Sequence, residues 1–432
     1  SARAAVEELR AEGVRVVVAT SAFGVDDHSS EETIRLAAVG AEMAVTCGHE
    51  ISKLYGLTTR TRTAVINASI LPKMIDTASM TEASVREAGI QAPLMVMRGD
   101  GGVMDIHEMR RRPAMTMLSG PAASVAGALM HLRVSDGIYF EVGGTSTNIG
   151  VIRNGRPTVK YARVGGHETY VSSLDVRVTG IAGGSMVRIR DGKLVDVGPR
   201  SAHIAGLPYS AFAEPSAFVG AQVELFRPKS GDPDDYVSIR VADGTRYAIT
   251  NTCAANVLGY AKPGLHAYGN PESARRAMAP LAAMLGCSVE DAARQILERA
   301  TAKAIPVVEQ LIAEYGLDRG QVVLVGEGGG VAALLPLTAE RMQLSHTISK
   351  DAEVISSIGV ALALVREVIE RVIPNPQPED LKAIKREAID AVVRLGAAAE
   401  NVEVTIEVNP HSQRVRAIAM GASEMRARRR SS

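Results

Sequence analysis

The sequence predicts an α/β protein, and three features of the chain support that class. First, the helical pattern AAVEELRAEG is followed by the apolar run VRVVVATSAF and by a second helical pattern, SSEETIRLAAVGAEM. Second, QVVLVGEGGGVAALLPLTAERM has the composition of a buried strand, a glycine loop and a helix. Third, the 432 residues are 46% hydrophobic, which is enough to bury two or three cores. Such alternation of strands and helices is typical of α/β layers.

The first third of the chain continues this alternation. One helix is expected to end at Gly13, and the next is expected to begin with Ser29 or Ser30 as its N-cap, since acidic residues follow in the first turn. A long helical stretch covers roughly residues 61–88. The run APLMVMRGDGG is typical of a buried strand that ends in a glycine turn.

From Gly137 onward the pattern changes to successive strands, GIYFEV, TNIGVI and PTVKYARV, which we expect to open one mixed sheet. The pair Asn154-Gly155 between the last two strands is typical of a tight hairpin turn. A small β-rich insertion is predicted near residues 205–260, and helices return in PESARRAMAPLAAMLG and VEDAARQILERATAKAIPVVEQLIAEYG. After the proline-rich linker IPNPQPED, the run NVEVTIEVNPHSQRVRAIAMGA predicts a hairpin in a small C-terminal module.

Composition and charge argue against several classes of function. The 48 basic and 48 acidic residues cancel, Trp is absent and aromatic residues make up 3% of the chain, so nucleic-acid binding is not expected. No apolar run reaches membrane-spanning length, and no membrane association is expected. The three cysteines form no CxxC pair, which favours a reducing compartment, and we expect a cytoplasmic protein. The nine histidines include no HxxxH arrangement, so a zincin-type metal site is not predicted.

A polar segment interrupts the strand pattern within FEVGGTSTNIGVIRNG. Its residues are Gly143, Gly144, Thr145, Ser146 and Thr147. Glycines let a backbone approach a phosphate closely, and successive N–H groups with neighbouring hydroxyls form an anion-binding concavity. Glu141, at the end of the preceding strand, is placed to hold Mg²⁺ through water, because that ion prefers oxygen ligands. The structural alternative is an exposed hairpin with a β-bulge.

A second glycine loop, LVGEGGG at residues 324–330, follows an apolar strand and precedes a helical run that begins at Val331. Backbone amides at a helix N-terminus would point at an anionic ligand. A tight strand-to-helix turn is the structural alternative. The two loops together would suit the phosphate and adenosine ends of one nucleotide.

Several motifs, in their order and spacing, resemble the hydantoinase/oxoprolinase family, which includes N-methylhydantoinase A, 5-oxoprolinase and acetone carboxylase subunits. The resemblance runs from about Arg3 to Arg366. It rests on TAVINASILPKM, APLMVMRGDGGVM, RRPAMTMLSGPAASVAGA, FEVGGTSTNIGVIRNGRP, TGIAGGSMVRI, VGPRSA, VVLVGEGGG and EVISSIG. It implies lobes of the actin-like ATPase type, with a ribonuclease H-like α/β fold.

The resemblance also implies a division of the chain. Residues 1–135 would be the remaining part of a first lobe, residues 136–372 a second lobe, and residues 373–432 a linker and a small C-terminal module. The family begins with another Gly-Gly-Thr hairpin, the first phosphate loop, and nothing like it precedes Ser1. The first lobe is therefore expected to be incomplete at its N-terminus, and ATP is expected to bind weakly.

ATP and Mg²⁺ are the cofactors that the resemblance implies. Residues 143–147 resemble the second phosphate-binding hairpin. The residues that resemble the adenosine loop are Gly326, Gly328, Gly329 and Gly330. Glu141 and Asp175 are the catalytic candidates, and Glu141 would hold Mg²⁺ through water. The candidates on the substrate side are Thr179, Gly183, Gly184 and His203.

The sequence departs from the family pattern at three places. The aspartates that usually flank the hairpin are replaced by Glu141 and Asn148. The family's Asp-x-His-Thr segment reads here as DVRV at residues 175–178, and its Pro-Gly-Pro run reads as AGLPYSAF. The substrate is therefore less defined than the fold.

Three hypotheses for the function follow. The first is ATP-dependent hydrolysis of a cyclic amide, such as a hydantoin or 5-oxoproline, through phosphorylation of the amide oxygen. The chain would be a subunit or fragment of a larger enzyme, with a second large subunit of the hydantoinase B type; a homo-oligomer is also compatible. The second is an ATP-dependent carboxylase subunit that activates a ketone or bicarbonate. The third is a non-catalytic nucleotide-binding scaffold.

Overall fold

The computed structural model describes residues 1–131 and 134–422, and the chain forms two compact units. Unit 1 comprises Ser1–Ala123, Val159–Leu174 and Val360–Ser432, and unit 2 comprises Ser124–Thr158 and Asp175–Gly359. Both units contain strands and helices, so the predicted α/β class is confirmed. Residues 423–432 of the predicted C-terminal module lie outside the described residues.

Unit 1 is assembled from three separate stretches of the chain. Its helices are α1 (Ala2–Ala11), α2 (Ser29–Gly40), α3 (Gly48–Ile51), α4 (Leu57–Glu87), α5 (Ile106–Arg111), η1 (Pro113–Thr116), α13 (Pro378–Arg394) and η5 (Ala399–Asn401). Its strands are β1 (Val16–Ala19), β2 (Ala44–Cys47), β3 (Met95–Met97), β4 (Val103–Asp105), β8 (Val159–Val164), β9 (His167–Leu174), β18 (Val365–Val372), β19 (Glu403–Asn409) and β20 (Arg414–Gly421). The expected long helix at residues 61–88 is thus confirmed as α4.

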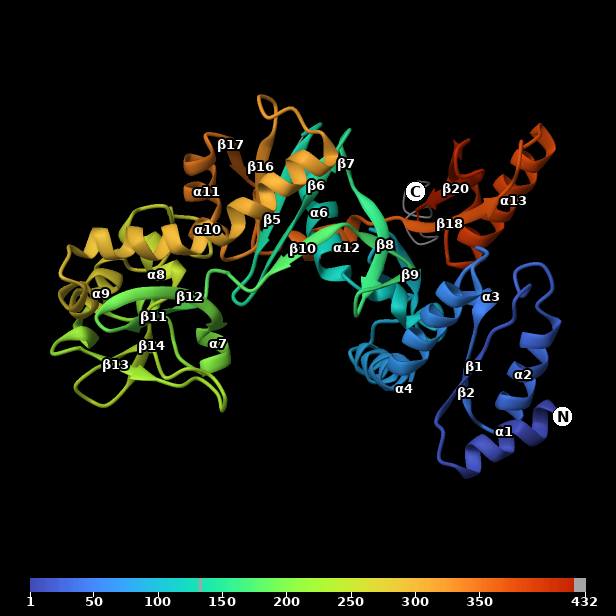
Figure 1. Ribbon diagram of the computed structural model, residues 1–432, viewed down its shortest axis with the longest axis horizontal. Coiled ribbons are helices and arrows are strands. Elements are labelled where there is room, and N and C mark those ends of the chain that lie inside the picture. The colour runs from blue at the N-terminus through green and yellow to red at the C-terminus, as the bar shows by residue number, and fades with distance from the viewer. Residues whose placement is uncertain (132–133, 423–432) are drawn as a thin grey trace. The chain divides into compact units, whose positions relative to one another are not determined.

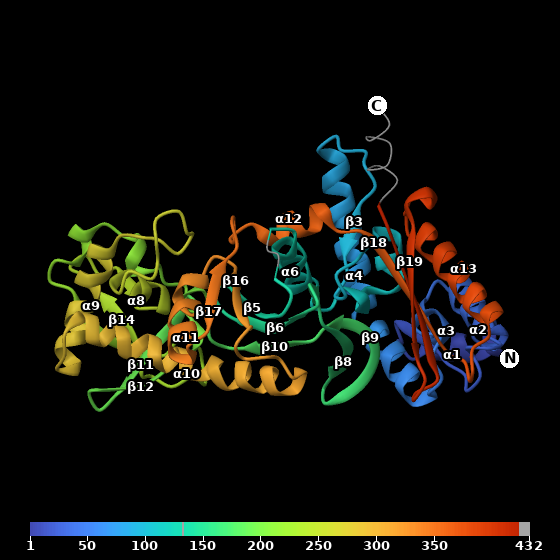
Figure 2. The same ribbon diagram turned by 90° about the horizontal axis from the view of Figure 1, so that it is seen from above.

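The strands of unit 1 form three sheets. β1 and β2 are parallel and joined by α2, β8 pairs with β9, and a third sheet has the order β19-β20-β18-β4-β3. The predicted C-terminal hairpin is confirmed as β19 and β20, and β20 pairs with β18 along its whole length. The helix α13 packs on this sheet, as Figure 2 shows.

Two local predictions in unit 1 need correction. The strand around Val159 does not join the sheet of Phe140 and Ile149, because β8 pairs with β9 and lies in unit 1. Helix α2 begins at Ser29, and His28, not a serine, occupies its N-cap position without a side-chain hydrogen bond. The backbone N–H of Ser29 donates instead to Oδ1 of Asp27 at 2.9 Å, so the acidic residue before the serines satisfies this helix end.

Unit 2 contains the segments that the sequence singles out for function. Its strands are β5 (Gly137–Val142), β6 (Thr147–Arg153), β7 (Arg156–Pro157), β10 (Val176–Thr179), β11 (Ser185–Arg190), β12 (Lys193–Ser201), β13 (Gln222–Phe226), β14 (Tyr236–Arg240), β15 (Arg246–Ala248), β16 (Val323–Glu327) and β17 (Ser345–Ile348). Its helices are α6 (Ser119–His131, mostly in this unit), α7 (Ala202–Ala205), η2 (Ser210–Phe212), η3 (Pro215–Phe218), α8 (Asn251–Val257), α9 (Pro271–Leu285), α10 (Val289–Tyr315), η4 (Val331–Ala333), α11 (Leu335–Met342) and α12 (Ile355–Leu362).

The central sheet of unit 2 has the order β10-β6-β5-β16-β17, with β7 paired to β6. β16 is parallel to both β5 and β17, while β5 and β6 are antiparallel. Figures 1 and 2 show α10 on one face of this sheet and α6 with α12 on the other. Coverage of both faces explains why consecutive residues of β5 are buried: Tyr139 on one face and Ile138 and Phe140 on the other are each at most 1% exposed.

A second sheet of unit 2, in the order β12-β11-β14-β13 with β15 beside β14, contains the predicted β-rich insertion. The sheet begins before residue 205, because β11 and β12 precede the insertion and supply half of its main path. The tight turn predicted at Asn154-Gly155 is confirmed, since both residues adopt positive φ angles of 51° and 68° between β6 and β7.

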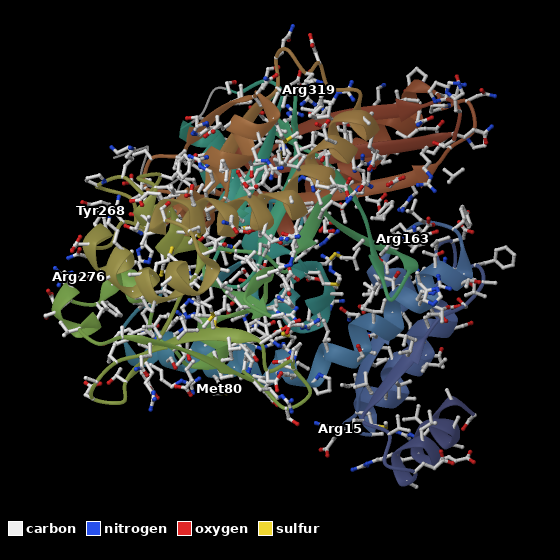
Figure 3. The ribbon with its side chains drawn as sticks, turned by 60° about the vertical axis from the view of Figure 1, so that its left-hand side comes forward. Arg15, Met80, Arg163, Tyr268, Arg276 and Arg319 are labelled. Atoms are coloured by element: carbon white, nitrogen blue, oxygen red, sulfur yellow. The ribbon has the colours of Figure 1, made fainter. Side chains whose placement is uncertain are left out.

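Helix ends in unit 2 follow local sequence signals. The hydroxyl of Ser288 accepts from the N–H of Asp291 at the start of α10, and Gly316 ends that helix with a φ of 57°. The outer surface carries charged and isolated apolar side chains; Tyr268, Arg276 and Arg319 of unit 2 are labelled in Figure 3, with Met80 of unit 1. No helix within residues 1–131 and 134–422 is both long enough and apolar enough to cross a lipid bilayer.

Candidate functional site

The first glycine segment forms the loop of the β5–β6 hairpin. The strands pair in register without a bulge, with Glu141 opposite Asn148 and Val142 opposite Thr147. The N–H of Gly143 donates to the carbonyl of Ser146 at 3.1 Å and closes the turn. Thr147 is therefore the first residue of β6, where it is fully buried and donates to the carbonyl of Ile181 at 2.6 Å. The loop proper comprises residues 143–146.

The hairpin loop presents free backbone donors. Within the described residues, the N–H groups of Gly144, Thr145 and Ser146 donate to no protein acceptor. Backbone N–H groups are nearly always paired unless water or a ligand accepts from them. Three successive free N–H groups beside two hydroxyl side chains are a suitable lining for an anion.

The second glycine loop is held against β5, the first strand of the hairpin. Gly326 and Glu327 end β16, in register with Phe140 and Glu141 of the parallel strand β5. Gly328 has a φ of 85°, which favours glycine, and the N–H of Gly330 donates to the carbonyl of Val142 at 2.9 Å. The expected helix does not begin directly at Val331. A 3-10 turn occupies residues 331–333, and α11 begins at Leu335. The irregular backbone of Leu334, with φ −127° and ψ −43°, separates the two.

A third glycine segment meets the other two. The N–H groups of Gly183 and Gly184 donate to the carbonyls of Gly143 and Gly144 at 3.1 and 3.0 Å. A Cβ atom on Gly183 would lie 3.0 Å from the Cα of Gly330, and one on Gly330 would lie 2.6 Å from the carbonyl oxygen of Gly143. These residues are glycines because their backbones touch, and segments far apart in sequence thereby form one group.

The hairpin glycines themselves have ordinary backbone angles. Neither Gly143 nor Gly144 has a positive φ, so their conformation does not require glycine. A Cβ on Gly144 would lie 2.5 Å from Nε2 of His203, whereas one on Gly143 would meet only the carbonyl oxygen of Ser146, at 3.4 Å. Glycine at position 144 makes room for His203, and position 143 faces open space.

The four substrate-side candidates named above all lie beside the hairpin, Gly183 through its hydrogen bond to Gly143. His203 lies against Gly144, and the hydroxyl of Tyr209 is 3.2 Å from its Nε2. Thr179 donates to the carbonyl of Thr147 at 3.3 Å, because β10 pairs with β6 at this end. Gly184 completes the set, and the hydroxyl of Thr145 lies 2.9 Å from that of Ser201.

Asp175 lies away from this group. β10 runs antiparallel to β6, with Val176 opposite Gly150 and Thr179 opposite Thr147, so Asp175 is at the far end of β10 from the hairpin loop. Its carboxylate accepts hydrogen bonds from Arg177 and from the hydroxyl of Tyr315. In unit 2 Asp175 is therefore part of an ion-pair and hydrogen-bond group with α10.

Glu141 is held in one orientation by two neighbours. Oε1 accepts from the hydroxyl of Ser124 on α6 at 2.9 Å, and Oε2 accepts from the amide of Asn148 at 2.7 Å. Each carboxylate oxygen keeps a further lone pair. Asn148, which replaces an aspartate of the family pattern, thus neutralises no charge but fixes the carboxylate by donating to it. The arrangement is compatible with a water-mediated Mg²⁺ contact.

Glu327 is a residue that the sequence interpretation missed. It is fully buried, neither of its oxygens has a partner among the described residues, and burial raises its pKa well above the usual range, with the charge of Glu141 adding to the effect. Its side chain is on the same sheet face as Glu141, because the two residues are in register on parallel strands. The signal in the sequence is one acidic residue inside the run VVLVGEGGG.

Comparison with known proteins identifies the family. The family model described as hydantoinase/oxoprolinase matches residues 60–369, which is more than half of the chain. The chain belongs to this family. The match covers all three glycine segments and confirms the resemblance noted from the motifs.

Curated relatives in this family are longer than the chain. Caprolactamase subunit alpha of Pseudomonas jessenii is 25% identical over 383 residues, which are 85% of this chain and 49% of the relative. An uncharacterized protein of Methanocaldococcus jannaschii is 24% identical over 386 residues, which are 84% of this chain and 53% of the relative. The chain thus spans about half the length of the curated relatives it matches.

Solved structures share the fold. The ATP-dependent caprolactamase from Pseudomonas jessenii has a TM-score of 0.69 at 21% identity, covering 97% of this chain and 66% of that one. A nucleotide-free acetone carboxylase has a TM-score of 0.64 at 17% identity with the same coverages. The fold similarity therefore extends over nearly all of the chain and includes both units.

Proposed function

We propose that this chain binds ATP at the glycine group of unit 2 and contributes to ATP-dependent hydrolysis of a cyclic amide, as part of a larger enzyme. The observation that carries the proposal is the set of free N–H groups at residues 144–146, which lie where three glycine segments meet. Family membership and the ATP dependence named for the caprolactamase structure support the choice of nucleotide.

The substrate class rests on the chemistry of the relatives. The name caprolactamase refers to a lactam, which is a cyclic amide. The hydantoins and oxoprolines after which the family is named are cyclic amides as well. Amide resonance makes ring opening by water slow. Transfer of the γ-phosphoryl group to the amide oxygen removes that resonance and releases ADP. Water then attacks the ring carbon and the C–N bond breaks, which leaves an acyl phosphate. A second water attacks the acyl carbon, so that the carboxylate is released and the former amide oxygen leaves with phosphate.

The protein groups in unit 2 would act mainly on charge and position. The N–H groups of Gly144, Thr145 and Ser146 would donate to phosphate oxygens, and the hydroxyls of Thr145 and Ser146 lie on the same loop. Glu141 would hold a water ligand of Mg²⁺, which supplies charge neutralisation at the phosphates when it is bound. His203, beside Gly144, is the nearest titratable side chain of the substrate-side candidates.

Oxygen labelling tests the proposed reaction. The chain, combined with the second large subunit that we propose as its partner, is incubated with Mg-ATP and 5-oxoproline or hydantoin labelled with ¹⁸O in the ring amide. We expect ring-opened product in step with ADP, and phosphate that carries one labelled oxygen. Ring opening with unlabelled phosphate would contradict phosphorylation of the amide oxygen. ATP-dependent incorporation of labelled bicarbonate into a ketone, with no ring opening, would favour the carboxylase function.

The nucleotide site can be tested in this chain alone. Gly143→Val adds a side chain in open space next to the free N–H groups, so we expect an unchanged melting temperature without nucleotide and loss of Mg-ATP binding in calorimetric titration. Gly144→Val is a poorer test, because its side chain would also displace His203. If Gly143→Val binds Mg-ATP like the parent, the loop is only a hairpin and the proposal fails. Binding without any turnover in the full complex would favour a nucleotide-binding scaffold.

The partner and location follow from the same proposal. A relative is named as subunit alpha, which supports assembly with a second large subunit of the hydantoinase B type; a homo-oligomer would be compatible with it. We place the reaction in the cytoplasm, where ATP is supplied.

A further inference from the structure

Unit 1 contains an open cavity of about 720 Å³ that has no part in the glycine group. At one wall it is lined by residues of α2, α3 and the segment before α2, including His28, Glu32, His49 and Glu50. β2 ends at Cys47 and α3 begins at Gly48, so His49 and Glu50 follow the carboxyl end of a parallel strand. Ligand sites in α/β proteins commonly lie at this end of the strands.

The side chains of Glu32, His49 and Glu50 gather at one point. One ligand atom from each lies within 4.8 Å of the others. The ring of His49 is more than nine-tenths buried, with 7% of the residue exposed, and His28 stacks on it with ring centroids 4.7 Å apart. The group therefore consists of one fixed imidazole and two carboxylates at the edge of a cavity.

A neighbouring carboxylate, Glu31, fixes the proton of His49. Oε2 of Glu31 accepts from the backbone N–H of His49 and lies 2.8 Å from its Nδ1. Oε1 accepts from the N–H and hydroxyl of Ser21. Both oxygens of Glu31 accept hydrogen bonds, so Nδ1 of His49 donates to Oε2 and the other ring nitrogen, Nε2, faces away from Glu31.

The other ring nitrogen faces a second acceptor. Nε2 of His49 is 3.3 Å from Oε1 of Glu32. Two lone-pair atoms repel unless a cation lies between them, either a proton on Nε2 or a metal ion. A charge-assisted N–H···O⁻ bond would be about 2.7–2.9 Å long, which is shorter than this distance. Two ligands about 2.0–2.1 Å from a tetrahedral zinc ion lie about 3.3 Å apart. The distance therefore matches the metal better than the proton.

Charged neighbours leave ligand atoms free. Arg35 binds Oε2 of Glu32 at 2.7 Å, so Oε1 is left facing His49. Arg111 pairs with Oε1 of Glu50. Lys53 also lines the cavity, but no ion pair joins it to either glutamate. Cys47 lies outside the group, and its buried thiol donates to the backbone carbonyl of Glu31 at 3.8 Å.

We propose that Glu32, His49 and Glu50 bind a divalent transition metal, with Zn²⁺ as the best match, and that the cavity leaves a coordination position open. Zinc accepts a ligand set of one histidine and two carboxylates. Glu31, which is hydrogen-bonded to the other ring nitrogen of His49, would orient that ligand. Three protein ligands at a cavity wall are typical of zinc sites that bind water or a substrate in the fourth position. The site lies within unit 1 and is independent of the proposed nucleotide site.

Zinc titration of the metal-free chain tests this proposal. We expect one Zn²⁺ bound through this group, with at least tenfold weaker binding in Glu32→Gln and in Glu50→Gln. Both side chains are partly exposed, so these variants are expected to fold, as melting curves in the presence of EDTA would verify. Glu387→Gln is the matched control, since Glu387 lines the same cavity but lies outside the group, and its affinity should stay within twofold of the parent.

Spectroscopy of the same proteins separates a metal from a proton. Co²⁺ bound in place of Zn²⁺ should give visible d–d absorption in the parent and the control and lose it in Glu32→Gln. In ¹⁵N spectra without metal, His49 should show a single proton on Nδ1 and shift on Zn²⁺ addition. A His49 ring that is doubly protonated at neutral pH in a chain that binds no Zn²⁺ would overturn the proposal. Equal affinity in the parent, Glu32→Gln and Glu50→Gln would overturn it as well.

Discussion

A methyl group on Gly330 should separate the glycine segments on which the proposed nucleotide site depends. In Gly330→Ala the new Cβ would lie 2.6 Å from the carbonyl oxygen of Gly143 and 3.2 Å from both the Cα and the N of Gly183. All three are backbone atoms, which cannot rotate away as a side chain can. The backbones must therefore move apart.

The cost follows from the contacts that this movement breaks. The hydrogen bonds at risk are Gly183 N–H to Gly143 O, at 3.1 Å, and Gly330 N–H to Val142 O, at 2.9 Å. Each bond contributes about 1 kcal/mol net, and overpacking of a close contact costs about 1–3 kcal/mol. We expect Gly330→Ala to lower the free energy of unfolding of unit 2 by about 3–5 kcal/mol when these are combined.

Hydrogen exchange of the backbone amides in β5 and β16, measured across a denaturant series, would report this loss in unit 2 itself. A readout from unit 2 is needed because the two units need not unfold together. Gly143→Ala is the matched control: it adds the same methyl group to the same loop group, but with a 3.4 Å contact and an ordinary φ. It should stay within about 0.5 kcal/mol of the parent, as substitutions without such clashes do. If both variants are equally stable, the segments do not pack as described.

Three further outcomes are expected. Because the pKa of Glu327 is raised, the parent should lose stability as pH rises above the ordinary value of 4.5. The loss should be about 1.4 kcal/mol per pH unit until the carboxyl ionises in the folded state. Glu327→Gln should remove this slope when the free energy of unfolding is measured from pH 5 to 7. Glu367→Gln should cost about 3–5 kcal/mol in the denaturant unfolding of unit 1, because it leaves the buried Arg98 without one of its carboxylates. Burial opposes the ionisation of Glu367, but Arg98 and Arg112 outweigh it and lower the pKa of this carboxyl. The stability that Glu367 contributes should therefore be present above pH 4.5 and be lost as pH falls through its pKa in the folded state. A Glu367→Gln variant with the same acid unfolding transition as the parent would contradict this. Thr145→Ala should weaken Mg-ATP binding by about 1–2 kcal/mol in calorimetry, the size of one lost hydrogen bond and its unsatisfied partner, and an unchanged affinity would remove Thr145 from the site.

Local sequence signals were sufficient to predict the elements whose formation depends on neighbouring residues in the chain. The helix α4, the β5–β6 hairpin, the turn at Asn154-Gly155 and the C-terminal hairpin follow from periodicity and turn residues over a few positions. Sheet membership was not predictable in the same way. The strand at Val159 was assigned to the wrong sheet, because the alternation of apolar and polar residues in a strand does not specify which strand it pairs with.

The candidate site shows the same limit. From the sequence, residues 143–147 were predicted to suit phosphate and residues 326–330 to suit adenosine, and both segments lie within the family match. It did not show that Gly183 and Gly184 bond to the hairpin, that Asp175 lies at the far end of β10, or that Glu327 is buried without a partner. Each of these depends on which strands are neighbours.

By itself, then, the sequence determined the class of fold, the family and the residue types of the loops, since these are properties of short segments and their order. Only the tertiary structure decided which groups face one another. Glu31 and Glu32 are adjacent in sequence, yet one orients His49 and the other faces its second ring nitrogen, because the fold brings the residues after β2 against the start of α2. Contacts between segments depend on packing, where the burial of apolar faces fixes positions that no local pattern specifies.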